Sequence, residues 1–144
     1  MVWWLCEHFG LDRCSVMLVD RAGHHLRIAA HHGIQDSVAE KVHVRIGQGV
    51  AGWVAHNRKP LFVRVGVMRR ASRATRSTPT TPNRSCARRS STTGRLMGVL
   101  NLSNKRDRQP FDESDLDRAI LAAGIFAITL GSNDAVRRTL VWAA

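Results

Sequence analysis

The stretch GRLMGVLNLSNK, residues 94–105, decides the fold of this chain. A glycine-centred turn leads into an apolar strand, and the strand ends at the polar pair Asn104-Lys105. A polar loop follows, and Phe111 precedes a helix. Asp112 is a residue type that caps helices, and acids in a first turn interact favourably with the helix dipole. The pattern predicts a strand, a loop and a long final helix.

This pattern resembles the end of a GAF domain, a small-ligand sensor module of signalling proteins. In that family the last strand reads G-x-L-x-G-V-L-x-L-x-N-K, and the loop closes on F-x-x-x-D at the start of the final helix. Phe111 and Asp115 supply that F-x-x-x-D here. The sequence departs from the family at Leu116, where members that bind cyclic nucleotides carry Glu.

The resemblance extends upstream in the order of the family. The matching segments look like two strands, a glycine loop with a short helix, and a further strand: residues 11–20, 26–33, 46–55 and 60–63. Residues 1–64 and 94–138 together fit the family. The resemblance implies an α/β fold with a central antiparallel sheet of five or six strands and flanking helices.

Length and composition indicate one globular domain, residues 1–144, with ordinary hydrophobic content of 44%. The longest apolar run, 119–130, is too short to span a bilayer, and the first residues show no signal peptide. The three cysteines, Cys6, Cys14 and Cys86, form no C-x-x-C pair. They favour a reducing, cytoplasmic location over a disulfide framework.

The net charge of +11 comes mainly from one segment, residues 66–93. That segment holds seven arginines and no acidic residue. Without them the chain has 15 basic residues, 22 less these seven, against 11 acidic ones. The composition of 66–93, rich in Ser, Thr and Arg, predicts a disordered basic segment.

The GAF resemblance requires a helix and an apolar strand where 66–93 stands. We assume that the serines use TCN codons and the arginines CGN codons. Reading codons 84–93 one base out of frame then gives, in order, two apolar residues, Cys or Arg, two small residues or prolines, and two more apolar residues. That order matches the missing strand. We therefore interpret 66–93 as a compensated frameshift, in the gene or in its sequencing. The alternative is a genuine basic insertion, and resequencing codons 64–95 separates the two.

The two ends of the chain are predicted to be helical. Residues 1–9 suggest an amphipathic helix with Trp4, Leu5 and Phe9 on one side. Residues 132–144 suggest the start of a linker helix toward an output domain. The helix from Asp112 onward has one apolar stripe for the sheet and a second at Leu121, Ile125 and Ile128. A helix apolar on two sides needs two partners. We therefore expect a homodimer through the terminal helices.

The family motif implies a structural clamp formed by Asn104, Lys105, Phe111 and Asp115. In this clamp an ion pair between Lys105 and Asp115 would hold the last loop to the helix without touching ligand. Exposed, such a pair contributes only about 0–1 kcal/mol. The alternative is that both charges are solvated.

Ligand contact is predicted at the glycine loop. Gly49, Val50, Ala51, Gly52 and Trp53 open a helix, where backbone N–H groups can hold an anion. In GAF domains that bind cyclic nucleotides this region borders the ligand. A tight turn with a purely structural role is the alternative.

Catalysis and metal binding are not predicted. Histidines occur as two adjacent pairs, at 24–25 and 31–32. Neighbouring residues of a strand point to opposite faces, so the two members of a pair cannot readily bind one metal, and surface histidines are favoured. Cys14, at the start of a core strand, reads as a small buried hydrophobe. GAF-fold enzymes that reduce free methionine sulfoxide use a catalytic thiol with partner cysteines. This sequence has no such cysteines at the matching positions. No cofactor, membrane or enzymatic activity is expected.

The leading hypothesis is a sensory module that binds a small ligand, with cyclic nucleotides as candidates, and that dimerises. Binding should be weak, because the arginines of 66–93 cannot be buried unpaired in a pocket wall. The alternatives are a degenerate dimerisation fragment that binds no ligand, a small enzyme on the same fold, and a basic nucleic-acid-binding protein.

Overall fold

The computed structural model describes residues 2–62, 85–90 and 96–132. Its elements follow in chain order: α1 (Val2–Phe9), β1 (Leu11–Val19), β2 (His25–His32), α2 (Asp36–Ala39), β3 (His43–Arg45), α3 (Gly49–Asn57), β4 (Leu61–Phe62), β5 (Ser85–Ser90), β6 (Gly98–Lys105) and α5 (Glu113–Ser132).

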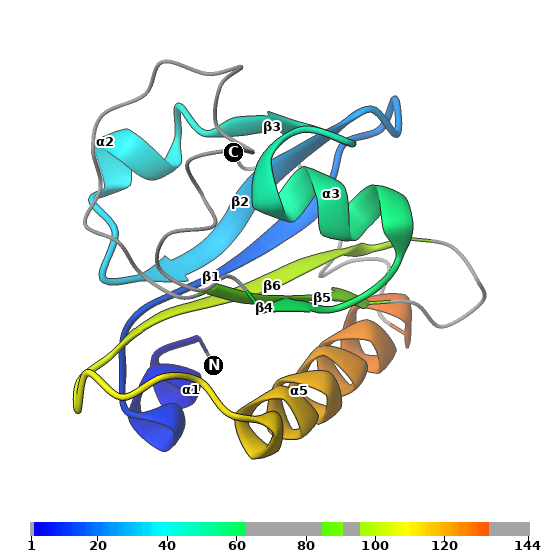
Figure 1. The fold of residues 1–144 in the computed structure, drawn as a ribbon. Helices are drawn as coiled ribbons and strands as arrows, with labels where there is room; N and C mark the ends of the chain where they lie inside the picture. Colours follow the sequence, from blue (N-terminus) through cyan, green and yellow to red (C-terminus); the bar gives the residue numbers. More distant parts are fainter. Residues whose placement is uncertain (1, 63–84, 91–95, 133–144) are drawn as a thin grey trace.

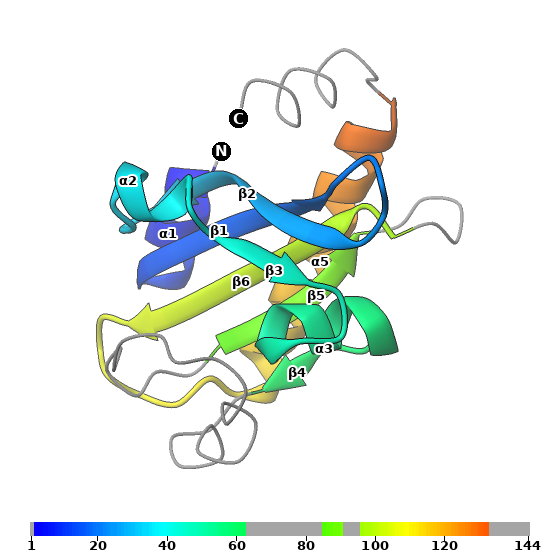
Figure 2. The same cartoon turned by 90° about the horizontal axis from the view of Figure 1, so that it is seen from above.

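The strands form one six-stranded sheet in the order β3-β2-β1-β6-β5-β4, with every neighbouring pair antiparallel. Helices α1 and α5 lie below the sheet and α2 and α3 above it (Figure 1). Figure 2 shows the same molecule from above, with α3 near the viewer and α5 beyond the sheet. We call the two sides the lower face and the upper face. The predicted α/β fold with a central antiparallel sheet is confirmed.

The lower face carries a continuous apolar core. Helix α1 packs there through Val2, Leu5, Cys6 and Phe9, which have the spacing of one helical stripe. Trp4 was predicted on this side, but it is 55% exposed and stacks on His8, with ring centroids 4.8 Å apart. Leu5 and Phe9 are buried on the predicted side, whereas the prediction is wrong for Trp4, which lies one position away from the buried stripe.

Helix α5 begins with a reciprocal cap. The Asp112 carboxylate accepts the backbone N–H of Asp115 at 2.8 Å, and the Asp115 carboxylate accepts that of Asp112 at 3.0 Å. Both bonds satisfy N–H groups that a helix start leaves without partners. The cap predicted at Asp112 is therefore present.

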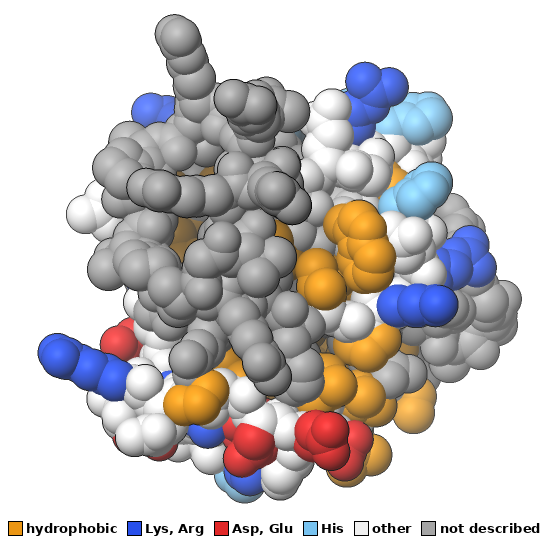
Figure 3. Space-filling view, viewed as in Figure 1, with side chains coloured by type: hydrophobic (Ala, Val, Ile, Leu, Met, Phe, Trp, Pro, Cys, Tyr) orange, Lys and Arg blue, Asp and Glu red, His pale blue; other side chains and the backbone are white. Residues whose placement is uncertain are grey.

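The two predicted stripes of α5 lie on opposite sides of the helix. In the first stripe Ala123, Ala127 and Leu130 are buried, and Ala123 and Leu130 belong to the core of the lower face. Leu121, Ile125 and Ile128 are 67%, 62% and 59% exposed. In the space-filling view, hydrophobic side chains appear on the surface over α5 (Figure 3). A single chain therefore leaves the second stripe uncovered.

The upper face has a smaller apolar core beneath α3. Ala51, Val54 and Ala55 of that helix pack on a cluster whose buried sheet residues are Met17, Leu26 and Val99. Each CH₂ group buried between the helix and the sheet stabilises the fold by about 0.8 kcal/mol. This cluster fixes α3 over one part of the sheet.

Six residues of the basic segment, Ser85–Ser90, form strand β5 between β4 and β6. Disorder was predicted for all of 66–93, so that expectation does not hold for these six. Backbone N–H and C=O groups can form a strand ladder whatever the side chains, and β6 provides backbone groups with which β5 pairs. The rest of 66–93, and 133–144 of the predicted linker helix, lie outside the described residues.

Candidate functional site

Lys105 and Asp115 are brought together where β6 ends and α5 begins. The Lys105 ammonium donates to the Asp115 carboxylate at 2.6 Å and lies 5.6 Å from the centre of the Phe111 ring. The Lys105 side chain is 14% exposed and that of Asp115 only 4%. Asn104 has a left-handed backbone, with φ of 61°, at the bend that precedes Lys105. The ion pair expected from the motif is present, and it is buried rather than solvated.

The electrostatics of Asp115 favour its charged form. Burial by itself would raise its pKa, but the hydrogen bonds from Lys105 and from the N–H of Asp112 outweigh burial and lower it. Arg118 adds a weaker attraction, with its guanidinium 3.8 Å from the same carboxylate. Asp115 therefore ties the β6 loop to the first turn of α5 as a carboxylate.

The predicted glycine loop forms a tight turn between β3 and α3. The N–H of Gly47 donates to the carbonyl of Gly52 at 2.8 Å, and Gly49 has a φ of +62°. A Cβ at Gly52 would lie 2.4 Å from the carbonyl oxygen of Arg45, so only glycine fits there. Ala51 is buried in the upper core, whereas Trp53 is 38% exposed. This geometry explains the glycines by packing, and ligand contact by residues 49–53 stays a prediction.

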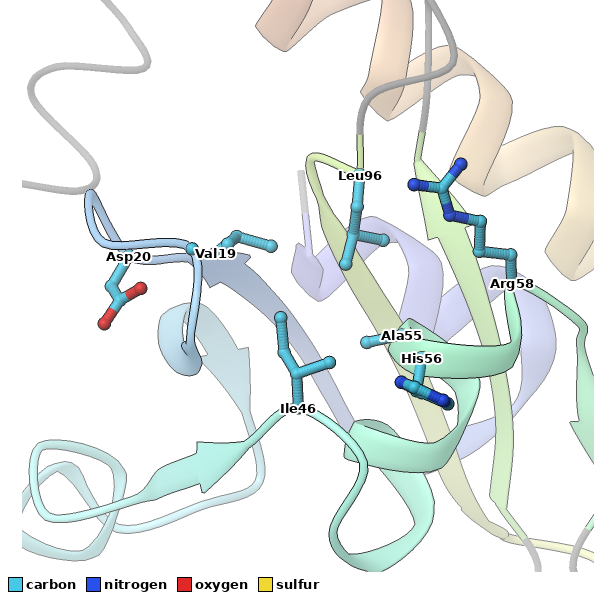
Figure 4. Close-up of a pocket in the computed structure, with 8 residues that line it drawn as sticks. Val19, Asp20, Ile46, Ala55, His56, Arg58 and Leu96 are labelled. Atoms are coloured by element: carbon cyan, nitrogen blue, oxygen red, sulfur yellow. The ribbon is translucent and has the colours of Figure 1, made fainter.

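A cavity of about 350 Å³ lies at the other end of α3. Val19, Ile46 and Leu96 point toward one another there, while the Asp20 carboxylate turns away (Figure 4). Polar side chains at its rim include His56. None of the five residues predicted to touch ligand lines this cavity. Sequence reasoning missed its lining because Val19, Ile46 and Leu96 read as ordinary core positions.

The hairpin beside the cavity is organised by Asp20. Its carboxylate accepts the backbone N–H groups of His24 and His25 at 2.9 and 3.2 Å, and lies 3.4 Å from the His25 ring. Although burial acts the other way, these hydrogen bonds lower the pKa of Asp20. Asp20 is thus engaged in holding the turn, and the described lining of the cavity combines apolar side chains with the polar groups of His56 and Arg58.

Two cysteine thiols meet beneath the sheet, which the sequence did not indicate. Cys6 of α1 and Cys14 of β1 are both buried and hydrogen-bonded to each other. Burial raises the pKa of Cys14, and the neighbouring Cys6 raises it further. Burial also raises the pKa of Cys6. Because the thiolate is the reactive form, both thiols are poor nucleophiles.

The described residues contain no cluster of three or more histidine, cysteine or acidic side chains with the spacing of a metal site. His31, one of the paired histidines, lies 3.4 Å from the Asp36 carboxylate. Within the described ranges, no helix is long and apolar enough to cross a membrane.

Comparison with known proteins places this geometry in one family. The model of the GAF domain matches residues 2–130. No curated protein matches the chain.

Solved structures with similar folds include two GAF domains. That of a phosphoenolpyruvate-protein phosphotransferase from Coxiella burnetii has 19% identity and a TM-score of 0.79, over 93% of this chain and 80% of that one. GAF-B of DevS from Mycobacterium smegmatis has 17% identity and a TM-score of 0.73, over 96% and 93%. A free methionine-R-sulfoxide reductase from Thermoplasma acidophilum has 14% identity and a TM-score of 0.71, over 91% and 87%. At these identities the likeness concerns the fold alone.

Proposed function

The chain belongs to the GAF domain family, and on this premise we propose that it is a regulatory module that binds a small molecule on the upper face of its sheet. GAF domains are typical sensory modules of signalling proteins. The observation that carries the proposal is the cavity lined by Val19, Ile46 and Leu96. Its volume of about 350 Å³ falls at the small end of ligand sites, which are mostly apolar with a few polar groups.

The candidate ligands are cyclic nucleotides, with weak affinity. The apolar walls suit the flat face of a base, and His56 and Arg58 at the rim supply polar groups. Leu116 stands where members that bind cyclic nucleotides carry Glu, which argues for low affinity. We expect a dissociation constant of about 1 mM, equivalent to about 4 kcal/mol.

We also propose that the module forms a homodimer through α1 and α5. The exposed stripe of Leu121, Ile125 and Ile128 is supplemented by Trp3 and Trp4 of α1, which are 60% and 55% exposed. Exposed apolar patches of this kind mark interaction sites. A second copy is the partner that the second apolar stripe of the last helix led us to expect. Joined helices would carry a ligand signal onward.

Catalysis is not part of the proposal. The thiols of Cys6 and Cys14 are buried with raised pKa, unlike the thiolate that a reductase needs. Two adjacent thiols that are not joined by a disulfide fit a reducing compartment, so we propose a cytoplasmic location. Nucleic acid is not a proposed partner, because the excess charge belongs to 66–93 and the remainder is near balance.

Titration of the ¹⁵N-labelled chain with cyclic GMP and with cyclic AMP tests the ligand site by NMR. Amide shifts are expected at Val19, Ala55 and Leu96, with saturation near 1 mM. Ile46→Trp should fill the cavity and abolish these shifts. Val38→Trp, an exposed position on α2, is the matched control and should leave them unchanged.

Shifts confined to residues 49–53 would move the site to the glycine loop. Micromolar affinity would show that the cavity is complete in this chain and would overturn the expected weakness. No shift with either nucleotide, together with a stable dimer, would favour the degenerate dimerisation domain instead.

A further inference from the structure

The upper face of the sheet is divided into an apolar half and a polar half. Opposed residues of antiparallel strands share a face. Met17 of β1 pairs with Val99 of β6 beneath α3, and both are buried in the upper core. Two residues earlier on β1, Ser15 pairs with Asn101 on one side and with His31 on the other. The upper face therefore changes from apolar to polar between Met17 and Ser15, which are neighbouring positions on that face of β1.

The polar half continues toward the start of β1. Arg13 pairs with Ser103 in unbroken register with Ser15 and Asn101, so the five side chains share the upper face. We define the polar half by these five residues: Arg13, Ser15, His31, Asn101 and Ser103. Helix α3 covers the other end of this face, and α2 lies beside the polar half (Figures 1 and 2).

Solvent exposure alone does not explain these polar residues. An antiparallel sheet can turn a polar face to water, but Ser15 is only 5% exposed and the other four are half-buried. Strands β1 and β6 are also interior strands of the sheet. Polar side chains buried at such positions need hydrogen-bond partners.

The described residues satisfy only part of this need. The Asn101 amide donates to the Ser15 hydroxyl at 3.4 Å, a long contact, and the His31 ring lies 3.4 Å from the Asp36 carboxylate. Within the described part of the chain, the side chains of Arg13 and Ser103 have no hydrogen-bond or ion-pair partner, although their backbones pair in the sheet. One surface thus carries the Arg13 guanidinium, the hydroxyls of Ser15 and Ser103, and the Asn101 carboxamide. These groups have more hydrogen-bond donors than the described residues use.

The charge of this surface selects an anion. Asp36 is already placed against His31, which leaves the Arg13 charge uncompensated by described residues. A guanidinium presents paired N–H groups that match a carboxylate in bidentate fashion. Ser15 lies two residues further along the strand, about 7 Å from Arg13. A ligand held at both points needs an anionic end and a second group of oxygen atoms.

We propose that the polar half is a binding site for a small carboxylate that also carries hydroxyl or carbonyl oxygens. Arg13 would hold the carboxylate, and Ser15, Asn101 and Ser103 would bond the other oxygens. The site lies about 13 Å along β1 from the Val19 cavity, since Val19 is four positions after Ser15. It is therefore distinct from the cavity assigned above.

NMR titration of the ¹⁵N-labelled 144-residue chain with L-malate, at constant ionic strength, tests this site. Amide shifts that saturate are expected at Ser15, His31 and Asn101. The neutral diamide of malate should produce none. Arg13→Gln should weaken malate binding at least tenfold, and Arg13→Lys, which keeps the charge but loses the fork, should weaken it less.

Arg27→Gln is the matched control for charge. Arg27 lies on β2 next to buried Leu26, and it is exposed on the opposite face of the strand. Both Gln variants retain the seven arginines of 66–93, so loose anion binding there affects them equally. Asn101→Asp provides a second test, because it preserves the shape of the side chain and should abolish binding by repulsion.

Equal weakening by Arg13→Gln and Arg27→Gln would overturn the proposal, as would equal binding of the neutral diamide. Inorganic phosphate that saturates the same residues more tightly than malate would overturn the assignment to a carboxylate. Malate shifts confined to Val19 and Ala55 would reject this site while leaving the proposed cavity intact.

Discussion

The two faces of the sheet differ in how completely the described residues fill them. On the lower face, α1, α5, β1 and β6 enclose one continuous apolar cluster, and a buried ion pair closes its edge. On the upper face, α3 covers an apolar patch, and beyond it lie a cavity at one end and the polar half at the other. The contrast separates the face that stabilises the fold from the face on which we propose that ligands bind.

The largest expected effect comes from β6, whose alternate residues serve the two faces. Leu102 is fully buried in the lower core, and Leu102→Ala should lower the free energy of unfolding by about 4 kcal/mol through lost burial and a residual cavity. Ser103→Ala, the adjacent position on the upper face, should cost about 0.5 kcal/mol. Urea denaturation of both variants measures the difference. Equal losses would contradict the division.

The clamp at the edge of the lower face gives the second effect. Asp115→Asn keeps the side-chain shape but leaves Lys105 largely buried without its partner, and we expect a loss of about 3 kcal/mol. Asp117→Asn, an exposed neighbour on α5, should change stability by no more than about 0.5 kcal/mol. Denaturant midpoints provide the comparison. A loss of stability no greater than that of Asp117→Asn would mean that the ion pair of Lys105 with Asp115 does not stabilise the fold.

The same carboxylate predicts a dependence on pH. The pKa of Asp115 in the folded chain is below its ordinary value of 3.8, so folding favours the ionised form. This contribution is fully present above pH 3.8 and is lost as the pH falls through the lowered pKa of the folded state. Stability in Asp115→Asn should therefore fall less steeply on acidification than in the parent chain. Thermal unfolding at pH steps from neutrality into the acid range measures the two slopes, and parallel slopes would refute the prediction.

The smallest effect on stability concerns the outer side of α5. Ile125→Glu should change the unfolding free energy of the monomer by no more than about 0.5 kcal/mol, because Ile125 is exposed. It should nevertheless raise the dimer dissociation constant more than tenfold by placing a charge in the interface. Sedimentation equilibrium measures that constant. Val38→Glu, the same kind of change on exposed α2, should not alter it, and a parent chain that stays monomeric would reject the dimer.

The sequence by itself determined most of the framework. The strand and helix periods are local, so residues 94–105 and the acids after Phe111 predicted β6, its loop and the cap of α5. The exposed stripe of α5 was also readable, because helical spacing separates Leu121 and Ile125 from the stripe at Ala123. The ion pair of Lys105 with Asp115 came from the family motif, although its burial did not.

Only the tertiary structure decided which residues meet across the sheet. The register places Ser15 between His31 and Asn101, residues far apart in the chain, and no local pattern encodes that pairing. The contact between Cys6 and Cys14 arises in the same way, from the packing of α1 under β1. Strand β5 formed where composition predicted disorder, because backbone pairing depends on neighbouring strands more than on side chains. Local periodicity fixes elements, whereas sites depend on long-range register and packing.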